Sequence, residues 1–294
     1  MDKVLVIIVS YNGEHWIERC VGSALFSDIK PDVMVIDNAS DDRTVQMLEE
    51  MEYSYKAKGL GLHVKYSPNN LGFGAANNIG FEYALEHGYD YVYLLNQDAY
   101  LEPGTISKLV DVHKWNPWLG ILSPVQLDAE GKADRQFAKR TGIRKTSKLD
   151  VPIKVKFVMA AHWLIPVAVL KKVGGFSPTF HHYGEDDNWV DRLHYHKFGI
   201  AVITSASAIH DRAKRTQSKE NRCKRKCLIP VIRMSRPQHR WSFAKSVMWL
   251  IGCSIKNFSL IPVKSIPELW ARRSEISKNR ESSMADGAFL SHRS

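Results

Sequence analysis

The chain has 294 residues, of which 44% are hydrophobic and 24% are charged. This composition excludes a protein that is disordered as its main state, and it allows one large domain with an appended segment. The net charge of +10 is unevenly distributed. From His210 onward there are 19 Lys or Arg and 6 Asp or Glu, against 22 and 25 before it. The C-terminal part is therefore expected to meet an anionic partner, such as a diphosphate, a membrane surface or a nucleic acid.

The cysteines indicate a reducing compartment. Cys20, Cys223, Cys227 and Cys253 lack the paired spacing of a disulfide framework. The N-terminus begins with a strand pattern and not with a signal peptide, so a cytoplasmic location is expected. Because no second Cys/His pair accompanies Cys223 and Cys227, no structural zinc is expected.

The first part of the chain has the pattern of an α/β fold. A continuous apolar run at Val4–Ser10 predicts a strand covered on both faces in a parallel sheet. A helix over about 14–26 and a strand at Asp32–Asp37 complete a right-handed βαβ unit. Next come a helix from about residue 40, a strand at 63–66, a helix at 75–87 and a strand at Tyr91–Asn96.

Polar residues end three of these strands: Ser10-Tyr11-Asn12, Asp37-Asn38 and Asn96-Gln97-Asp98. Open parallel sheets bind ligands beyond the carboxyl ends of their strands. The sequence therefore predicts a ligand site at this edge of the sheet.

Shorter elements follow from about residue 151. They are a strand at 154–159, a helix at 166–173, a helix after Glu185 and a strand at 201–204. We expect them to form an acceptor half on the same sheet.

A basic loop and an apolar helical face follow His210. The face consists of Trp241, Met248, Ile251, Ile255 and Phe258. Lys245 and Lys256 argue against a membrane span. The face could lie on the cytoplasmic surface of an anionic membrane, or pack on the catalytic domain or on a second subunit. Periodicity does not distinguish these alternatives.

Several segments together resemble a known family. They are VIIVSYNG, VIDNASDD, NLGFGAANNIG, LLNQDAYL, GGFSPTFHHYGEDDNWVDRL and a late IH. In order and spacing they resemble the motifs of the large inverting glycosyltransferase family 2 typified by bacterial rhamnosyltransferases, over roughly residues 3–215. The resemblance implies the GT-A fold, an α/β fold with a Rossmann-like, mostly parallel central sheet flanked by helices. It also implies transfer of a sugar, with rhamnose favoured, from a nucleotide-sugar donor to a glycan or lipid-linked acceptor of the cell surface.

This resemblance suggests a division of the chain. Residues 1–215 would form the catalytic domain, with a nucleotide-sugar half at about 1–120 and an acceptor half at about 121–215. Residues 216–294 would form a basic, partly amphipathic helical segment. The oligomeric state stays open.

The resemblance, together with the position and chemistry of the residues, predicts the donor-binding residues. They are Ser10, Tyr11, Asn12, Asp37, Asn70, Gly72, Asn77, Asn96, Gln97, Asp98, Arg212, Lys214 and Arg215. Asp37 can accept from a base N–H or a ribose hydroxyl, or it can cap the next helix. Gly72 lets the backbone approach a ligand closely or turn with positive φ. Arg212 and its basic neighbours could neutralise a leaving diphosphate or form a solvated loop.

A divalent metal and a general base complete the expected site. Asn96 replaces the first carboxylate of the family's D-x-D-like metal motif. Asp98 and His210 are therefore the expected ligands of Mn²⁺ or Mg²⁺, with phosphate oxygens and waters. Glu185, Asp186 and Asp187 crowd the start of a helix, where like charges can raise the pKa of one carboxyl. The resemblance favours Asp186 as the base, with Asp187 as the alternative and Glu185 beside them.

Two other functions fit single features of the sequence. A nucleic-acid-binding protein could use Lys224, Arg225 and Lys226. This function does not explain the acidic body or the carboxylates at the strand ends. A nucleotidyltransferase would show a Gly-rich loop with a basic residue after the first strand, where this chain has SYNGEHW. Neither is favoured, and no nucleic-acid partner is expected.

Overall fold

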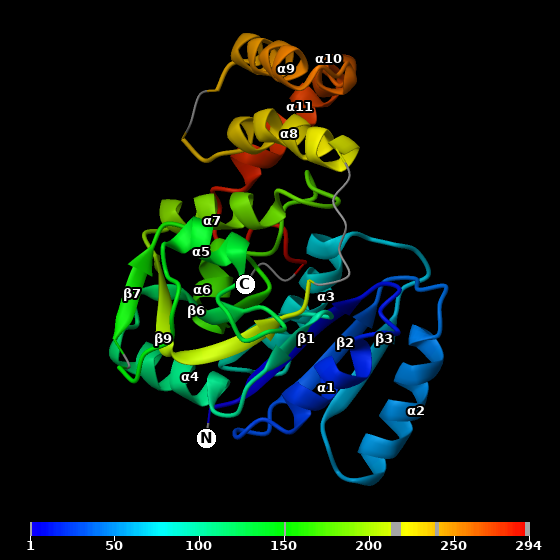
Figure 1. Cartoon of the computed structure of the whole chain (residues 1–294), viewed down its shortest axis with the longest axis vertical. Helices are drawn as coiled ribbons and strands as arrows, with labels where there is room; N and C mark the ends of the chain where they lie inside the picture. The colour runs from blue at the N-terminus through cyan, green and yellow to red at the C-terminus, as the bar shows by residue number, and fades with distance from the viewer. Residues whose placement is uncertain (1, 150, 213–218, 239–240, 292–294) are drawn as a thin grey trace.

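A nine-stranded sheet forms the body of the protein (Figure 1). The computed structural model describes residues 2–149, 151–212, 219–238 and 241–291. The strands are β1 (Val4–Ser10), β2 (Asp32–Asp37), β3 (Leu62–Tyr66), β4 (Tyr91–Asn96), β5 (Ala99–Leu101), β6 (Leu119–Leu127), β7 (Pro152–Val155), β8 (His162–Pro166) and β9 (Gly199–His210). The helices are α1 (Ile17–Leu25), α2 (Thr44–Ala57), α3 (Phe73–Glu86), α4 (Thr105–Trp115), α5 (Arg135–Thr141), α6 (Val167–Val173), α7 (Glu185–Tyr195), α8 (Lys219–Met234), α9 (Phe243–Asn257), α10 (Ile261–Lys264) and α11 (Ile266–Ser282).

The first four strands pair in parallel, in the order β3-β2-β1-β4. In β1, Ile7 stands opposite Met34 of β2 and Leu94 of β4. Because β1 has a neighbour on each side and helices over both faces, its residues from Val4 to Ile8 are all buried. The carboxyl ends of β1, β2 and β4 consequently lie along one edge, as expected.

The rest of the sheet is mixed. β8 runs antiparallel to β4 and β6, while β6 and β9 are parallel to each other. β5 and β7 each pair antiparallel with β9. The parallel order expected for most of the sheet is thus confined to its N-terminal half and the β6–β9 pair. The later elements do extend the same sheet.

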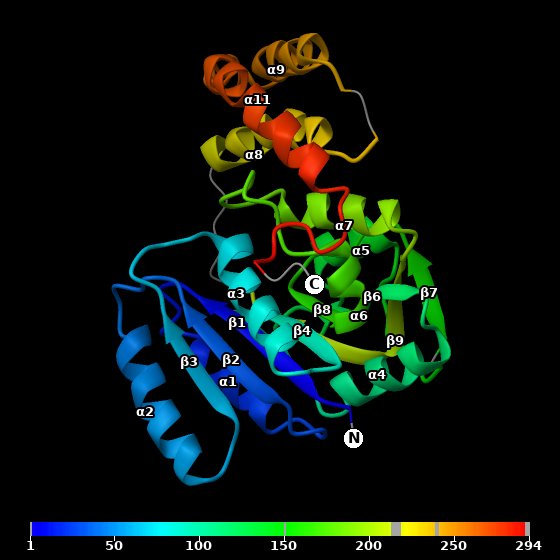
Figure 2. The same cartoon turned by 180° about the vertical axis from the view of Figure 1, so that it is seen from behind.

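Helices cover both faces of the sheet (Figures 1 and 2). Alternate side chains of a strand point to opposite faces. Val6 and Ile8 therefore pack with α1, α2 and α4 in one buried cluster. Leu5 and Ile7 pack with α3, α6 and α7 in the other. The result is a three-layer body with a core on each side of the sheet.

The helices α8, α9, α10 and α11 form a separate group beyond α7 at one end of the molecule (Figure 1). Their own core contains Val231, Met234, Leu250, Leu269 and Ile276. In the part of the chain that the structure describes, no helix is both long enough and apolar enough to cross a membrane.

The chain returns to the body after α11. The Gly175 N–H donates to the Ala288 carbonyl at 2.8 Å, and Leu290 is buried in the cluster beneath α3 and α6. The hydroxyl and the N–H of Ser291 both donate to Glu82 of α3, at 2.7 and 2.8 Å. The last described residues are therefore part of the α/β body.

Three sequence predictions need correction. The strand expected at 154–159 is β7 (Pro152–Val155), because antiparallel pairing with β9 sets its register. The helix expected from residue 40 begins at Thr44, since Ser40 binds Asp37 instead. Trp241 does not share the outer face of α9, because its ring packs inward against the core of the helical group.

Candidate active site

The ends of β1 and β2 are joined by buried polar contacts. Asp37 Oδ1 accepts from the hydroxyls of Ser10 at 2.9 Å and Ser40 at 2.6 Å. Asn12, with a left-handed φ of 49°, accepts from the Asp41 N–H at 2.9 Å. Its own N–H donates to Ser40 at 3.0 Å. Asp37 and Asn12 thus fix the shape of this edge.

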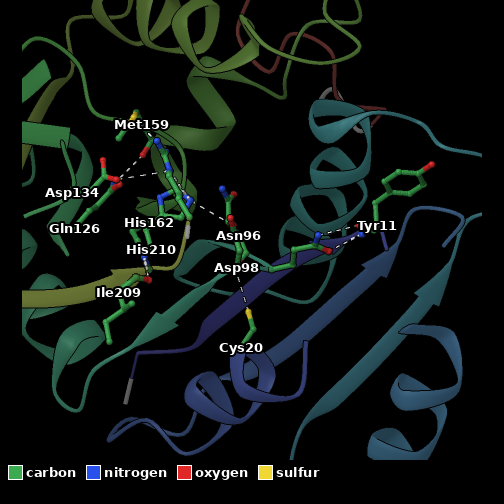
Figure 3. Close-up of polar contacts among 12 residues, drawn as sticks. Tyr11, Cys20, Asn96, Asp98, Gln126, Asp134, Met159, His162, Ile209 and His210 are labelled. Carbon is green, nitrogen blue, oxygen red and sulfur yellow. Dashed lines mark hydrogen bonds and ion pairs between the residues drawn. The ribbon is translucent and has the colours of Figure 1, made fainter. Parts of the chain in front are cut away.

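The ends of β1 and β4 are joined by Gln97. Its side-chain amide pairs with the Tyr11 backbone in both directions: Oε1 accepts from the Tyr11 N–H at 2.7 Å, and Nε2 donates to the Tyr11 carbonyl at 3.0 Å. A Cβ at Gly13 would lie 2.5 Å from Gln97 Oε1. Gly13 was not among the predicted residues, yet only a glycine leaves room for this pairing. The exposed Tyr11 ring is left facing the open edge (Figure 3).

The glycine-rich turn before α3 meets the loop that precedes α7. Asn70 Oδ1 accepts from the Asn38 side chain at 3.0 Å and from the Gly72 N–H at 2.9 Å. Gly72 has a φ of 82°, and a Cβ there would lie 2.0 Å from the carbonyl oxygen of His181. The glycine is needed for this backbone contact. Asn77 is buried inside α3 and donates to the Phe73 carbonyl at 2.8 Å, a structural role.

Asp98 and His210 form a buried pair. His210 Nε2 lies 3.5 Å from Asp98 Oδ1, and both side chains are only 1% exposed. The antiparallel pairing of β5 with β9, which places Ala99 opposite His210, brings the two together. Figure 3 shows Asn96 and Asp98 beside His162 and His210.

This donor set fits a divalent cation. A carboxylate and an imidazole suit Mn²⁺ or Mg²⁺ when phosphate oxygens and waters supply the remaining ligands. Within the described residues, the buried Asn96 Oδ1 has no hydrogen-bond partner and offers a further oxygen. No group of three or more His, Cys, Asp or Glu at metal-binding distance occurs in that same part of the chain.

Arg212 lies beside this pair. Its Nε is 3.3 Å from His210 Nε2 and 3.9 Å from Asp134 Oδ2. Asp134 in turn caps α5 by accepting from the Phe137 N–H at 2.8 Å. Lys214 and Arg215, the other two basic residues predicted here, lie outside the described residues.

His162, which was not predicted from the sequence, lies beside the Asp98–His210 pair: the ring centroids of His162 and His210 are 6.3 Å apart. Its Nδ1 lies 3.1 Å from the Tyr93 hydroxyl, and its Nε2 lies 3.1 Å from the Ile209 carbonyl. Burial, and secondarily His210, lowers the pKa of His162 to about 3, so the ring is neutral at pH 7. A neutral ring that donates to Ile209 fixes the strand just before His210. A histidine inside an otherwise apolar strand was the available signal.

Three carboxylates begin α7. Glu185 is buried, whereas Asp186 and Asp187 are partly exposed. Burial, followed by the charge of Asp187, raises the pKa of Asp186. Burial also raises the pKa of Asp187, but Arg140, whose Nη1 lies 3.7 Å from Asp187 Oδ1, opposes that shift. Burial raises the pKa of Glu185 as well.

The short helix α5 links the two parts of the site. Its cap Asp134 stands near Arg212, and Arg140 in its last turn stands near Asp187. At 1.5 Å per residue these positions are about 9 Å apart along the helix. The Asp98–His210 pair and the α7 carboxylates therefore lie near opposite ends of α5.

The loop before α7 is held by the C-terminal helices. Phe180 is buried in the core of the helical group. Arg272 donates to the Thr179 carbonyl at 2.6 Å, and Asn279 donates to the Thr179 hydroxyl at 3.0 Å. Tyr183 and Gly184 both have positive φ, 67° and 95°. This turn leads directly into the three carboxylates.

Comparison with known proteins agrees with this architecture. A model of glycosyl transferase family 2 matches residues 5–174. The N-acetylglucosaminyl-diphospho-decaprenol L-rhamnosyltransferase of Mycobacterium tuberculosis is 25% identical over 246 residues, which cover 73% of this chain and 78% of that protein.

Solved structures show the same fold. S. aureus TarS 1–349 in complex with UDP aligns with a TM-score of 0.58 at 18% identity, covering 96% of this chain and 90% of that one. GalNAc-T7 with UDP, GalNAc and Mn²⁺ aligns with a TM-score of 0.62 at 15% identity, covering 97% of this chain and 55% of that one. These likenesses show the GT-A fold.

Proposed function

The chain belongs to glycosyl transferase family 2, and from this premise we propose that it transfers a sugar from a nucleoside-diphosphate donor to an acceptor hydroxyl with inversion at the anomeric carbon. Membership of the family makes the protein a glycosyltransferase. The proposed inverting transfer rests on one observation. The α7 carboxylates lie near one end of α5, and the Asp98–His210 pair lies near the other.

Asp186 is the proposed general base. It removes the proton of the acceptor hydroxyl, whose oxygen then attacks the anomeric carbon while the bond to the diphosphate breaks. A single displacement inverts the configuration. Arg140 lies beside Asp187 and pairs with it, which favours Asp186 over Asp187 for this role. A raised pKa brings the carboxyl closer to neutral pH and makes it a better proton acceptor.

The departing nucleoside diphosphate needs positive charge nearby. Arg212, at the end of β9, is the described cation beside the Asp98–His210 pair. A Mn²⁺ or Mg²⁺ ion held by Asp98 and His210 would act as a Lewis acid on the diphosphate oxygens. Tyr11, Asn70 and Gln97 border the edge where the nucleoside is expected, and Ser10, Asn12 and Asp37 hold the backbone that shapes it.

We propose L-rhamnose as the sugar and a lipid-linked glycan as the acceptor. The support is the mycobacterial relative, whose name specifies both an L-rhamnosyl transfer and a diphospho-decaprenol acceptor. The enzyme would then work at the cytoplasmic face of the cell membrane. The nucleic-acid-binding and nucleotidyltransferase alternatives find no support, because the matching family transfers sugars.

A donor screen tests the proposal. The full chain is incubated with Mn²⁺, a polyprenyl-diphosphate-linked N-acetylglucosamine acceptor and one donor at a time: dTDP-rhamnose, UDP-glucose, UDP-galactose or UDP-GlcNAc. Release of nucleoside diphosphate is followed by mass spectrometry. We expect one donor to be consumed and an acceptor to gain its sugar with inverted configuration. Formation of a nucleoside triphosphate and a sugar phosphate when pyrophosphate is added would indicate a nucleotidyltransferase. Retained configuration would overturn the single displacement.

A further inference from the structure

The outer face of α9 carries a row of exposed apolar side chains. Met248, Ile251, Ile255 and Phe258 are spaced by three, four and three residues, so they share one side of the helix. Their exposures are 64%, 43%, 71% and 94%. Phe258 caps the helix with a left-handed φ of 48°. We call these four residues the apolar stripe.

The opposite side of α9 is already used. Ser246, Leu250 and Cys253 are buried against the other helices of the group. Trp249 also turns inward, and its indole N–H donates to the Lys226 carbonyl at 3.4 Å. The helix is thus anchored by one face, and the stripe is the face left over. In Figure 1, α9 lies at the far end of the molecule from the sheet, where a flat surface could reach it.

The stretch of sequence that contains the stripe carries charge of one sign. Between Glu220 and Glu268 the sequence contains ten Lys or Arg and no Asp or Glu. Lys245, Lys256 and Lys264 are exposed on or next to α9. Apolar side chains with lysines beside them match the boundary of an anionic lipid bilayer, where rings and aliphatic chains enter below the headgroups and ammonium groups meet phosphates. A nucleic acid would use the lysines but not the stripe.

We propose that the apolar stripe of α9, with Lys245, Lys256 and Lys264, docks the protein on an anionic membrane surface. The helix lies in the plane of the headgroups and inserts Ile255 and Phe258 among the acyl chains. The α/β body stays outside the bilayer. Docking is a property of the helical group and does not depend on the proposed sugar transfer, since it requires neither donor nor acceptor.

Vesicle flotation of the full chain tests the proposal. Vesicles of phosphatidylcholine, with or without phosphatidylglycerol, are mixed with protein at low salt. We expect flotation with the anionic vesicles only. The double variant Ile255→Ser/Phe258→Ser should lower the partition coefficient at least about tenfold, because two large side chains no longer leave water. The variant Leu149→Ser/Trp115→Ser is the matched control, since these residues are 67% and 88% exposed on the body.

Other outcomes overturn the proposal. Equal flotation of the stripe variant and wild type would show that charge alone binds the lipid. Equal binding to neutral vesicles would show that docking does not require an anionic surface. If light scattering shows that the wild type is a dimer without lipid and the stripe variant a monomer, the stripe is a contact between two copies. If wild type prefers duplex DNA to anionic vesicles and the stripe variant binds the DNA equally, the basic segment serves a nucleic acid.

Discussion

The guanidinium of Arg272 donates a hydrogen bond of 2.6 Å to the carbonyl oxygen of Thr179. The two residues are far apart in the sequence, and the bond joins α11 to the loop that delivers Asp186. Phe180, next to Thr179, is buried in the core of the helical group. The helical group therefore helps to set the position of the proposed base.

Arg272→Ala should lower turnover about tenfold, with a smaller effect on the donor dissociation constant, because Thr179 belongs to the loop that leads into the proposed base Asp186. Loss of a hydrogen bond from a charged donor should also cost about 2 kcal/mol of stability. Steady-state kinetics, donor titration and urea unfolding measure these effects. The control is Arg273→Ala, whose side chain stacks on Trp270 instead. Equal turnover of both variants would show that the loop holds its shape without Arg272.

Asp186→Asn should lower turnover at least about a hundredfold and leave donor binding almost intact, as expected when a general base is lost. Asp187→Asn should have a smaller effect, because Asp187 is paired with Arg140. Single-turnover assays with a saturating donor compare the two. If the order of the effects is reversed, Asp187 is the base.

The acid limb of the pH–rate profile reports on the same carboxylate. Burial and the nearby Asp187 raise the pKa of Asp186, so turnover should fall on acidification well above about pH 4, the ordinary range of an aspartate. The base works only when deprotonated, and Arg140 favours that form. Arg140→Ala should therefore raise this pKa further and move the limb to higher pH. Lys139→Ala, one residue away on α5, is the control. If the acid limb of the pH–rate profile stays at the same pH in Arg140→Ala, the titrating group is not Asp186.

Chelation should abolish transfer, and Mn²⁺ or Mg²⁺ should restore it. Asp98→Asn and His210→Ala should each raise the metal concentration for half-maximal activity at least about tenfold, since each removes a ligand. Paramagnetic resonance of Mn²⁺ with bound donor provides a reading independent of turnover, and circular dichroism checks the fold. His87→Ala, at the far end of α3, should behave as wild type. Full activity in the presence of chelator would show that Arg212 and its basic neighbours neutralise the diphosphate without a metal ion.

Gly13→Ala should weaken donor binding about tenfold, because its Cβ would lie 2.5 Å from Gln97 Oε1 and break the amide pairing with Tyr11. Gly22→Ala is the matched control: nothing lies within 4 Å of its Cβ, and alanine favours a helix interior. Donor titration by calorimetry compares them. Should Gly13→Ala bind normally, the Tyr11–Gln97 pairing does not shape the nucleotide site.

Continuous apolar runs predict β1, β2 and β4 with the bounds that the structure shows, because a strand buried on both faces needs no polar alternation. β8 was not predicted. His162 interrupts its apolar pattern, and the imidazole is tolerated only because Tyr93 and Ile209 bond to it across the sheet. The need for glycine at position 13 could not be predicted from the sequence either. It arises from a contact with Gln97, which follows a different strand, β4.

The helical spacing in α9 predicts an apolar face, but α9 is apolar on two sides. Leu250 faces inward and Ile255 faces outward, although both are large and aliphatic. Which side the neighbouring helices cover depends on α8 and α11, and the helical segment predicted at 216–294 carried no bounds for either of them. Trp241 was consequently assigned to the wrong side.

The return of the chain after α11 makes the helical group an insertion and not a tail. The chain leaves the body after β9 and returns to it at Asp286, which pairs with Lys172 of α6. Further on, the carbonyl oxygen of Ala288 would lie 2.0 Å from a Cβ at Gly174. A protein shortened before α8 would therefore lose Ala288 and Leu290 from beneath α6 and expose part of the core. Conversely, a linker could replace the helices between β9 and Asp286, because the contacts of Ala288 and Leu290 with the body would be kept. Such a variant would show whether the catalytic body folds without the helices that hold the loop before α7.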